Sequence, residues 1–135
     1  MTPAGPSDPE RAAVERLIAA GRFEDALTRL RARPDATATW PLQADILKRL
    51  GRLDEALTLR AAQVRARPVS SVAEHNLAAL LGDMGRHAEA EAAVRRALAK
   101  GGDAPETWLV LARSLTAQDR HDEGEAAYRQ AVLRR

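Results

Sequence analysis

The sequence contains no cysteine, which excludes disulfide bonds, cysteine-ligated metal sites and cysteine nucleophiles. Aromatic residues are also scarce, at 3% of the 135 residues, although 45% of the residues are hydrophobic. The core must therefore be built from alanine, leucine and valine, which suit closely packed helices better than sheets. No apolar run approaches the roughly 18 residues of a membrane-spanning helix, and the first residues do not resemble a signal peptide. We expect a soluble, cytoplasmic protein with no membrane segment.

Lysine is nearly absent, yet the charges of the sequence are balanced. The 21 basic residues are interleaved with 19 acidic residues and leave a formal net charge of +2. A nucleic-acid-binding protein would concentrate its basic residues on one face, so we do not expect nucleic acid as a partner. The arginine clusters at 29–33 and 65–67 fall at expected helix C-termini, where basic side chains are favourable for the helix dipole alone. The excess of arginine over lysine and the abundant alanine suggest a bacterial source with a GC-rich genome.

The motifs of common enzyme classes are missing from the sequence. It has no Gly-x-Ser-x-Gly, no Walker-type glycine loop, no Gly-x-Gly-x-x-Gly and no His-Glu-x-x-His. His87 and His121 occupy the same position in a repeated segment, and His75 lies outside it, so all are better explained as structural or surface residues than as metal ligands. We therefore expect no catalytic residue, no cofactor and no metal, and a protein that is not an enzyme.

A segment of six residues recurs four times without gaps. The copies begin at residues 21, 51, 85 and 119, so the intervals are 30, 34 and 34 residues. The copies are Gly21-Arg22-Phe23-Glu24-Asp25-Ala26, Gly51-Arg52-Leu53-Asp54-Glu55-Ala56, Gly85-Arg86-His87-Ala88-Glu89-Ala90 and Asp119-Arg120-His121-Asp122-Glu123-Gly124. A repeat of this length indicates a stack of similar structural units.

Each position of this segment has a physical reason to recur. Glycine at the start of three copies can adopt the left-handed conformation that ends a helix, and Asp119 in the fourth copy tolerates it too. The acidic residue at the fifth position falls in the first turn of the next helix, where it complements the helix dipole. The sixth position holds Ala26, Ala56, Ala90 or Gly124, and a minimal side chain there lets two helix backbones pass closely.

Apolar residues at helical spacing on both sides of each segment predict two helices per repeat. We expect eight helices and no strand, with the helices at about 8–20, 23–33, 39–50, 53–67, 71–84, 87–100, 104–118 and 121–134. Asp8-Pro9, Ser71–Glu74 and Asp103–Glu106 have the composition of helix starts, with a capping box at Ser71–Glu74. Residues 1–6 are expected to be a disordered lead.

The fourth copy carries Trp108, Leu111-Ala112 and Leu115, followed by Gly124, Tyr128 and Ala131, and the third and second copies carry related residues at the same spacing. With these residues the sequence resembles the tetratricopeptide repeat family, over about four repeats that cover residues 7–135. The resemblance implies an all-α, right-handed superhelical solenoid of antiparallel helix pairs, in a single domain with repeats at about 7–36, 37–70, 71–104 and 105–135. Two features depart from the family: Arg60 replaces an apolar residue, and Pro34 shortens the first repeat.

In this family the first helix of each repeat lines a concave surface, and this implies a partner-binding groove. The implied groove residues are Arg11, Glu15, Leu42, Asp45, Arg49, His75, Asn76, Ala79, Asp83, Leu109, Val110, Arg113 and Thr116. An asparagine at the place of Asn76 can bind the backbone of an extended peptide, or it is simply a solvated polar residue. A clamp for a C-terminal carboxylate, known in some relatives, would need more than Arg11, Asn76 and Arg113. The mixed groove fits instead a peptide or helix with apolar and charged positions.

The resemblance favours a protein-interaction scaffold that binds a peptide or protein segment without catalysis. The alternative is an accessory recognition domain of a larger bacterial enzyme, such as a transferase or oxygenase, of which this chain is a fragment. The sequence stops at Arg134-Arg135 with no polar capping helix after the last repeat, and a terminal repeat must cover its outer face. We therefore expect either a fragment or a homodimer through the uncapped C-terminal helix.

Overall fold

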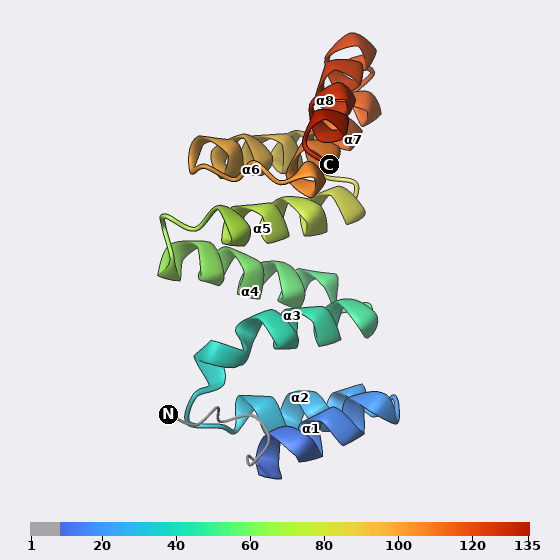
Figure 1. The fold of residues 1–135 in the computed structure, drawn as a ribbon. Coiled ribbons are helices and arrows are strands. Elements are labelled where there is room, and N and C mark those ends of the chain that lie inside the picture. Colours follow the sequence, from blue (N-terminus) through green and yellow to red (C-terminus); the bar gives the residue numbers. More distant parts are fainter. Residues whose placement is uncertain (1–8) are drawn as a thin grey trace. The chain divides into compact units, whose positions relative to one another are not determined.

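The computed structural model describes residues 9–135, and these contain eight α-helices, one 3-10 helix and no strand (Figure 1). The elements are α1 (Pro9–Ala19), α2 (Phe23–Arg31), η2 (Ala36–Thr39), α3 (Trp40–Arg49), α4 (Leu53–Ala66), α5 (Ser71–Asp83), α6 (His87–Ala99), α7 (Pro105–Ala117) and α8 (His121–Leu133). The prediction of an all-helical chain with two helices per repeat is confirmed. The expected lead at 1–6 and the expected cap Asp8 lie outside the described residues.

Three of the four repeated turns are built on glycine in the left-handed region, and the fourth is built on aspartate. The φ angles are +74° at Gly21, +77° at Gly51, +77° at Gly85 and +61° at Asp119. In each turn the following arginine donates its backbone N–H to the carbonyl five residues earlier, at 2.8–3.0 Å. This bond closes the Schellman motif that ends a helix. The predicted role of the first position of the repeat is confirmed, including that of Asp119.

The segment before α3 differs from the prediction of a single helix over 39–50. A short 3-10 helix, Ala36–Thr39, precedes α3, which begins at Trp40 with Pro41 in its first turn. The hydroxyl of Thr39 donates to the Ala36 carbonyl at 2.7 Å, and Gln43 Nε2 donates to the same carbonyl at 3.2 Å. These bonds add to backbone bonds of the 3-10 helix, such as that from the Ala38 N–H to the Asp35 carbonyl at 2.9 Å. Apolar periodicity does not report side-chain bonds of this kind, so it gave no sign of the element.

The chain divides into two compact units, one up to Leu59 and one from Arg60, and α4 crosses the division. In the first unit α1 packs on α2, and α2 packs on α3. The buried core of this unit consists of Val14, Ala26, Leu27, Leu30, Ala44, Ile46, Leu47 and Ala56. The expected single domain and the boundaries of its repeats stay predictions.

The second unit contains a run of helix pairs in which α5 contacts α6, α6 contacts α7 and α7 contacts α8. The first helices α5 and α7 also contact each other directly. Its core is rich in alanine, with Ala78, Ala90, Ala93, Ala97 and Ala112 at 0% exposure. Such small side chains let the helix backbones approach closely, as the sequence predicts for the sixth position of the repeated segment.

The capping box predicted at Ser71–Glu74 is wrong. The N-cap of α5 is Ser70, whose side-chain oxygen accepts the backbone N–H of Ala73 at 3.1 Å. Glu74 is instead 1% exposed and accepts hydrogen bonds from Lys100 at 2.7 Å and Arg96 at 3.0 Å, both from the end of α6. Burial alone would raise the pKa of Glu74, but the hydrogen bonds from these two cations outweigh it and lower the pKa.

Candidate partner-binding surface

An ion pair recurs at all four repeated turns and helps to fix the start of each second helix. The arginine at the second position of the segment pairs with the acidic residue three positions later. The pairs are Arg22–Asp25 at 2.6 Å, Arg52–Glu55 at 2.5 Å, Arg86–Glu89 at 2.7 Å and Arg120–Glu123 at 2.7 Å. The arginine is visible in the sequence, because every copy of the segment begins with Gly-Arg or Asp-Arg. The sequence-based prediction gave a role only to the acidic residue and not to this arginine.

Two of these arginines also reach back to the second helix of the preceding repeat. Arg52 donates to Glu24 of α2 at 2.8 Å, and Arg120 donates to Glu91 of α6 at 2.6 Å. Gln118 Nε2 donates to the same Glu91 oxygen at 3.1 Å. Burial raises the pKa of Glu91, but hydrogen bonds from Arg95, Gln118 and Arg120 lower it overall. These contacts hold successive repeats in register within each unit.

Three of the predicted groove residues line one pocket of the first unit. The pocket has a volume of about 410 Å³ and lies between α1, the connection after α2, and α3. It is lined by Arg11, Val14, Glu15, Leu30, Arg33, Asp35, Ala38, Thr39, Pro41 and Leu42. Apolar side chains therefore share this pocket with two acidic and two basic side chains.

The charged residues of this pocket form two pairs. Arg11 lies 3.7 Å from Glu15 along α1, and both side chains are exposed. Arg33 Nε donates to Asp35 at 2.7 Å, and its side chain is only 18% exposed. The hydrogen bond from Arg33 lowers the pKa of Asp35, so this carboxylate stays ionised to a lower pH than usual. A second ion pair thus lines this pocket, formed by two residues that are not among the groove residues implied by the family resemblance.

Asp45 and Arg49, the other predicted groove residues of this unit, are exposed on α3 and do not line the pocket. The guanidinium of Arg49 lies 5.7 Å from the ring centre of Phe23, at the start of α2. Such a cation–π contact orients the arginine and leaves part of its charge available to solvent.

In the second unit, the predicted groove residue His75 lies at the contact between α5 and α7. Its Nδ1 is 3.3 Å from the hydroxyl of Thr107, which is 4% exposed. Burial lowers the pKa of His75, and the nearby Glu106 opposes that change. His75 therefore joins two first helices in its neutral form, and its ring is only half-buried.

Asn76 and Arg113 differ from His75 because the polar groups of their side chains have no partner among the described residues. Asn76 is half-buried on α5 and Arg113 is exposed on α7, and neither makes a side-chain hydrogen bond or ion pair within residues 9–135. Asp83 is exposed at the end of α5, while Ala79, Leu109 and Val110 are half-buried. A half-buried amide with no partner is a group that a ligand can satisfy.

Thr116 lies toward α8. A Cβ atom added to Gly124 would come within 2.4 Å of the Thr116 hydroxyl oxygen, so this side chain occupies the crossing of α7 and α8. The predicted groove residues fall into two sets, one in each unit.

The part of the chain from Pro9 onward holds no group of three or more histidine, cysteine, aspartate or glutamate side chains that could bind a metal ion. His87 Nδ1 is buried without a partner, and His121 is exposed 3.6 Å from Asp119. No helix in the same part has both the length and the apolar character needed to cross a bilayer.

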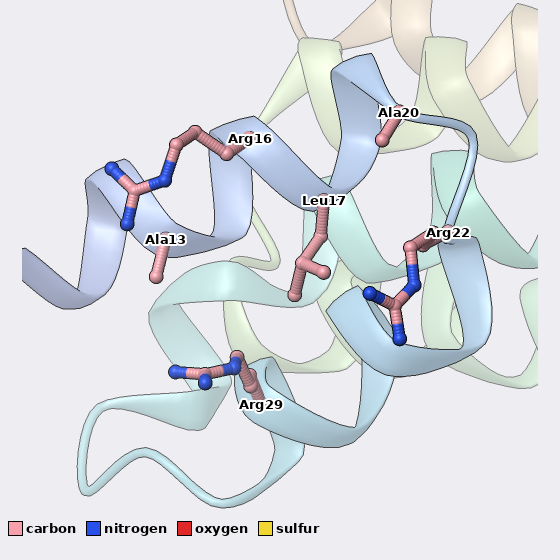
Figure 2. A pocket seen from close by; sticks show the side chains of 6 residues that line it. All are labelled: Ala13, Arg16, Leu17, Ala20, Arg22 and Arg29. Carbon is pink, nitrogen blue, oxygen red and sulfur yellow. The ribbon is translucent and has the colours of Figure 1, made fainter.

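A second pocket of about 290 Å³ lies on another face of α1 and α2 (Figure 2). Three arginines and three apolar residues line it: Ala13, Arg16, Leu17, Ala20, Arg22 and Arg29. Figure 2 shows Leu17 directed from α1 into a space that Arg22 and Arg29 flank. None of these residues is among the predicted groove residues. The basic side chains come from different segments, which no local motif reveals.

The tetratricopeptide repeat family matches residues 75–135 of the chain. Among curated proteins, none matches the sequence. Solved structures of MamA have a similar fold at low sequence identity, and this likeness concerns the fold alone. MamA from Desulfovibrio magneticus RS-1 is 20% identical with a TM-score of 0.78, over 92% of this chain and 72% of that one. MamA of AMB-1 is 18% identical with a TM-score of 0.74, over 90% of this chain and 68% of that one.

The likeness to MamA, a protein that contains tetratricopeptide repeats, extends beyond the segment matched by sequence, because it covers about nine-tenths of the chain. It therefore includes the first unit, where the family match is absent. The predicted helical repeat solenoid is confirmed. The chain is thus similar to the tetratricopeptide repeat family by sequence over residues 75–135, and its fold is similar to that of MamA over most of its length.

Proposed function

We propose that the chain is a protein-interaction scaffold whose first helices bind a peptide or protein segment without catalysing a reaction. The observation that carries this proposal is the pocket of about 410 Å³ lined by Arg11, Glu15 and Leu42, three residues that the family resemblance assigns to the groove. A repeat fold supports protein partners in general, and this pocket supports a specific place for one.

The lining of this pocket defines the kind of peptide that fits. Leu42, Pro41 and Ala38, all exposed, provide apolar surface for an apolar side chain of the partner, and the buried Val14 and Leu30 also line the pocket. Arg11 and Asp35 lie at the same pocket and carry opposite charges, so charged residues on either side of the apolar one find complementary groups. The partner is therefore expected to alternate apolar and charged positions.

Asn76 and Arg113 support peptide binding in the second unit. Their side chains are free within residues 9–135, so binding breaks no existing hydrogen bond or ion pair of these two groups. An amide side chain offers one acceptor and two donor hydrogens, which match the C=O and N–H of an extended peptide. Asn76 and Arg113 stand on α5 and α7, which pack against each other, and a preformed surface of this kind reduces the entropic cost of association.

The proposal is tested by capturing partners from a lysate of the source organism and identifying them by mass spectrometry. We expect Leu42→Asp, which places a charge in the apolar part of the pocket, to lose partners that the unaltered chain retains. The double variant Asn76→Ala with Arg113→Ala should lose some of the same partners. Arg65→Ala, at an exposed position of α4, is the control and should retain all of them.

Melting curves must accompany these captures, because a loss of folding would also remove partners. Leu42 is 38% exposed and Arg113 is exposed, so we expect the variants to melt close to the unaltered chain. If folded variants of both kinds capture the same proteins as the unaltered chain, the proposed surface is not the binding surface.

We propose a second partner, another copy of the chain, on the basis of the last helix. Tyr128, Val132 and Leu133 are 39%, 61% and 75% exposed on α8. Exposed apolar side chains clustered on one helix are typical of an interaction surface. We further infer, from composition alone, that the protein works in the cytoplasm of a bacterium.

A further inference from the structure

The repeat interval gives each residue of α1 an equivalent in every later first helix. Leu17 is equivalent to Leu47, Leu81 and Leu115, at intervals of 30, 34 and 34 residues. The three later leucines are 0%, 5% and 2% exposed, but Leu17 is only half-buried and lines the open pocket of Figure 2. This pocket therefore lies on a face of α1 whose equivalents in later repeats are covered.

The second unit shows what covers the equivalent face of α7. Glu91 of α6 accepts hydrogen bonds from Gln118 at 3.1 Å and Arg120 at 2.6 Å. The equivalents of these two donors in the first repeat, 98 residues earlier, are Ala20 and Arg22, and both line the pocket of Figure 2. The pocket is thus the position that a preceding second helix would occupy if it packed on α1 as α6 packs on α7.

The last helix carries side chains equivalent to those of α6. Glu125 and Tyr128 of α8 stand 34 residues after Glu91 and Val94 of α6. Each glutamate pairs with an arginine four residues later. Val94 is fully buried, but Tyr128 is 39% exposed and Val132, one turn later, is 61% exposed. The exposed face of α8 therefore carries a glutamate and apolar side chains, as α6 does where it packs on the following repeat.

We propose that α8 of one copy of the chain packs on α1 of the next copy, in the register in which α6 packs on α7. Glu125 then meets Arg22 of the next copy, as Glu91 meets Arg120. Tyr128 and Val132 cover Leu17. This inference rests on the self-association proposed above and names the surface that receives α8, while peptide binding by the first helices is independent of it.

Charge complementarity supports this occupant of the pocket. Arg22 pairs with Asp25, and Arg29 pairs with Glu10, but Arg16 makes no ion pair within the described part of the chain. The equivalents of Arg16 in the later repeats are the buried residues Ile46, Leu80 and Ser114. An unpaired arginine beside an apolar floor favours a helix that presents both a carboxylate and apolar side chains, and α8 does.

A contact between two different faces does not close on itself, because each copy keeps one face free for another copy. Analytical ultracentrifugation of the 135-residue chain tests this directly. We expect the weight-average mass to rise with concentration above the 14.6 kDa of one chain and to pass twice that value without a plateau. A symmetric dimer through α8 would stop at twice the mass.

Two variants separate the two faces. Leu17→Asp should block the face on α1, and Tyr128→Asp should block the face on α8, so each variant alone should remain at the mass of one chain. Their equimolar mixture should form a dimer and stop there, because only one intact face of each kind is left. Ala126→Asp is the matched control, since Ala126 is exposed and its equivalent in α6 is the exposed Ala92, and it should associate like the unaltered chain.

A charge exchange provides a second test at exposed positions. Arg22→Glu and Glu125→Arg should each reduce association at least tenfold, and both changes in one chain should restore it. Circular dichroism must show that each variant is folded. A chain that keeps a single-chain mass at all concentrations overturns the proposal and the self-association with it. Dimers that persist in Leu17→Asp overturn only the contact between α8 and α1.

Discussion

Gly124 shows how one residue sets the distance between two helices. It occupies the small position of the fourth repeat, and a Cβ atom there would lie 2.4 Å from the Thr116 hydroxyl and 3.3 Å from the Ala112 carbonyl. We expect Gly124→Ala to lower the free energy of unfolding by about 1–3 kcal/mol, because the added methyl overpacks the crossing of α7 and α8. Thermal and urea denaturation measure this change.

Gly82 is the matched control for this substitution. It also lies within a helix, α5, but a Cβ atom there would meet nothing within 4 Å. Gly82→Ala should raise the stability by about 0.4–1 kcal/mol, since alanine restricts the unfolded chain. Adding Thr116→Ala to Gly124→Ala should recover most of the loss. If Gly124→Ala alone were as stable as the unaltered chain, the close approach of these helices would be wrong.

The small residues at the sixth position of the segment could be predicted from the sequence, because each repeat needs a small side chain at the same helix contact. Ala26, Ala56 and Ala90 recur at the interval of the repeat, and all three are 0% exposed in the structure. The role of Glu74 was not predictable in this way. Its cationic partners lie 22 and 26 residues later at the end of the next helix, and a capping box has the same local pattern.

At the scale of elements, this buried carboxylate joins the start of α5 to the end of α6. The pKa of Glu74 is lower in the folded protein than its ordinary value of 4.5, so ionisation of Glu74 favours the folded state. That contribution is fully present above about pH 4.5, and it is lost as the pH falls through the lower folded pKa. We expect Glu74→Gln to cost about 1–3 kcal/mol at pH 7, the range for hydrogen bonds to charged groups.

Denaturation at several pH values tests this expectation. As the pH falls below 4.5 and through the lowered pKa of Glu74, the carboxylate becomes protonated, so the difference between Glu74→Gln and the unaltered chain should shrink. The control is Glu89→Gln, which removes an exposed pair with Arg86 and should change the melting temperature little at any pH. If the difference between Glu74→Gln and the unaltered chain stayed constant from pH 7 down to the acid unfolding of both proteins, ionisation of Glu74 would not stabilise the fold.

The prediction of helices succeeded where apolar periodicity and turn residues agreed, and it failed at the connection after α2, where side-chain hydrogen bonds add to a short 3-10 helix. The 3-10 helix at Ala36–Thr39 depends on hydrogen bonds from Thr39 and Gln43 that no apolar pattern encodes. The pocket lined by Arg11 and Leu42 could be predicted only in part for the same reason. Its other charged pair, Arg33 and Asp35, lies in that irregular connection. The family resemblance could assign only residues of the first helices.

At the scale of the whole molecule, the helices of each unit are stabilised by contacts with their neighbours in that unit. Within the second unit the contacts join α5 with α6, α6 with α7, α7 with α8 and α5 with α7. In such a protein the stability approximates a sum of terms for single repeats and for neighbouring pairs. A local defect should therefore lower protection near the defect before it unfolds distant repeats.

Ala90→Trp creates such a defect in the second unit. Ala90 is 0% exposed on α6, and a tryptophan there must displace α5 or α7, at a cost on the order of 1–3 kcal/mol or more. We expect amide hydrogen exchange to become faster in α5, α6 and α7, while the amides of α1 and α2 keep their rates. Ala92→Trp, at an exposed position of the same helix, should leave all rates unchanged. Equal acceleration in every helix would show instead that the chain unfolds as one cooperative block, and the nearest-neighbour account of its stability would then be wrong.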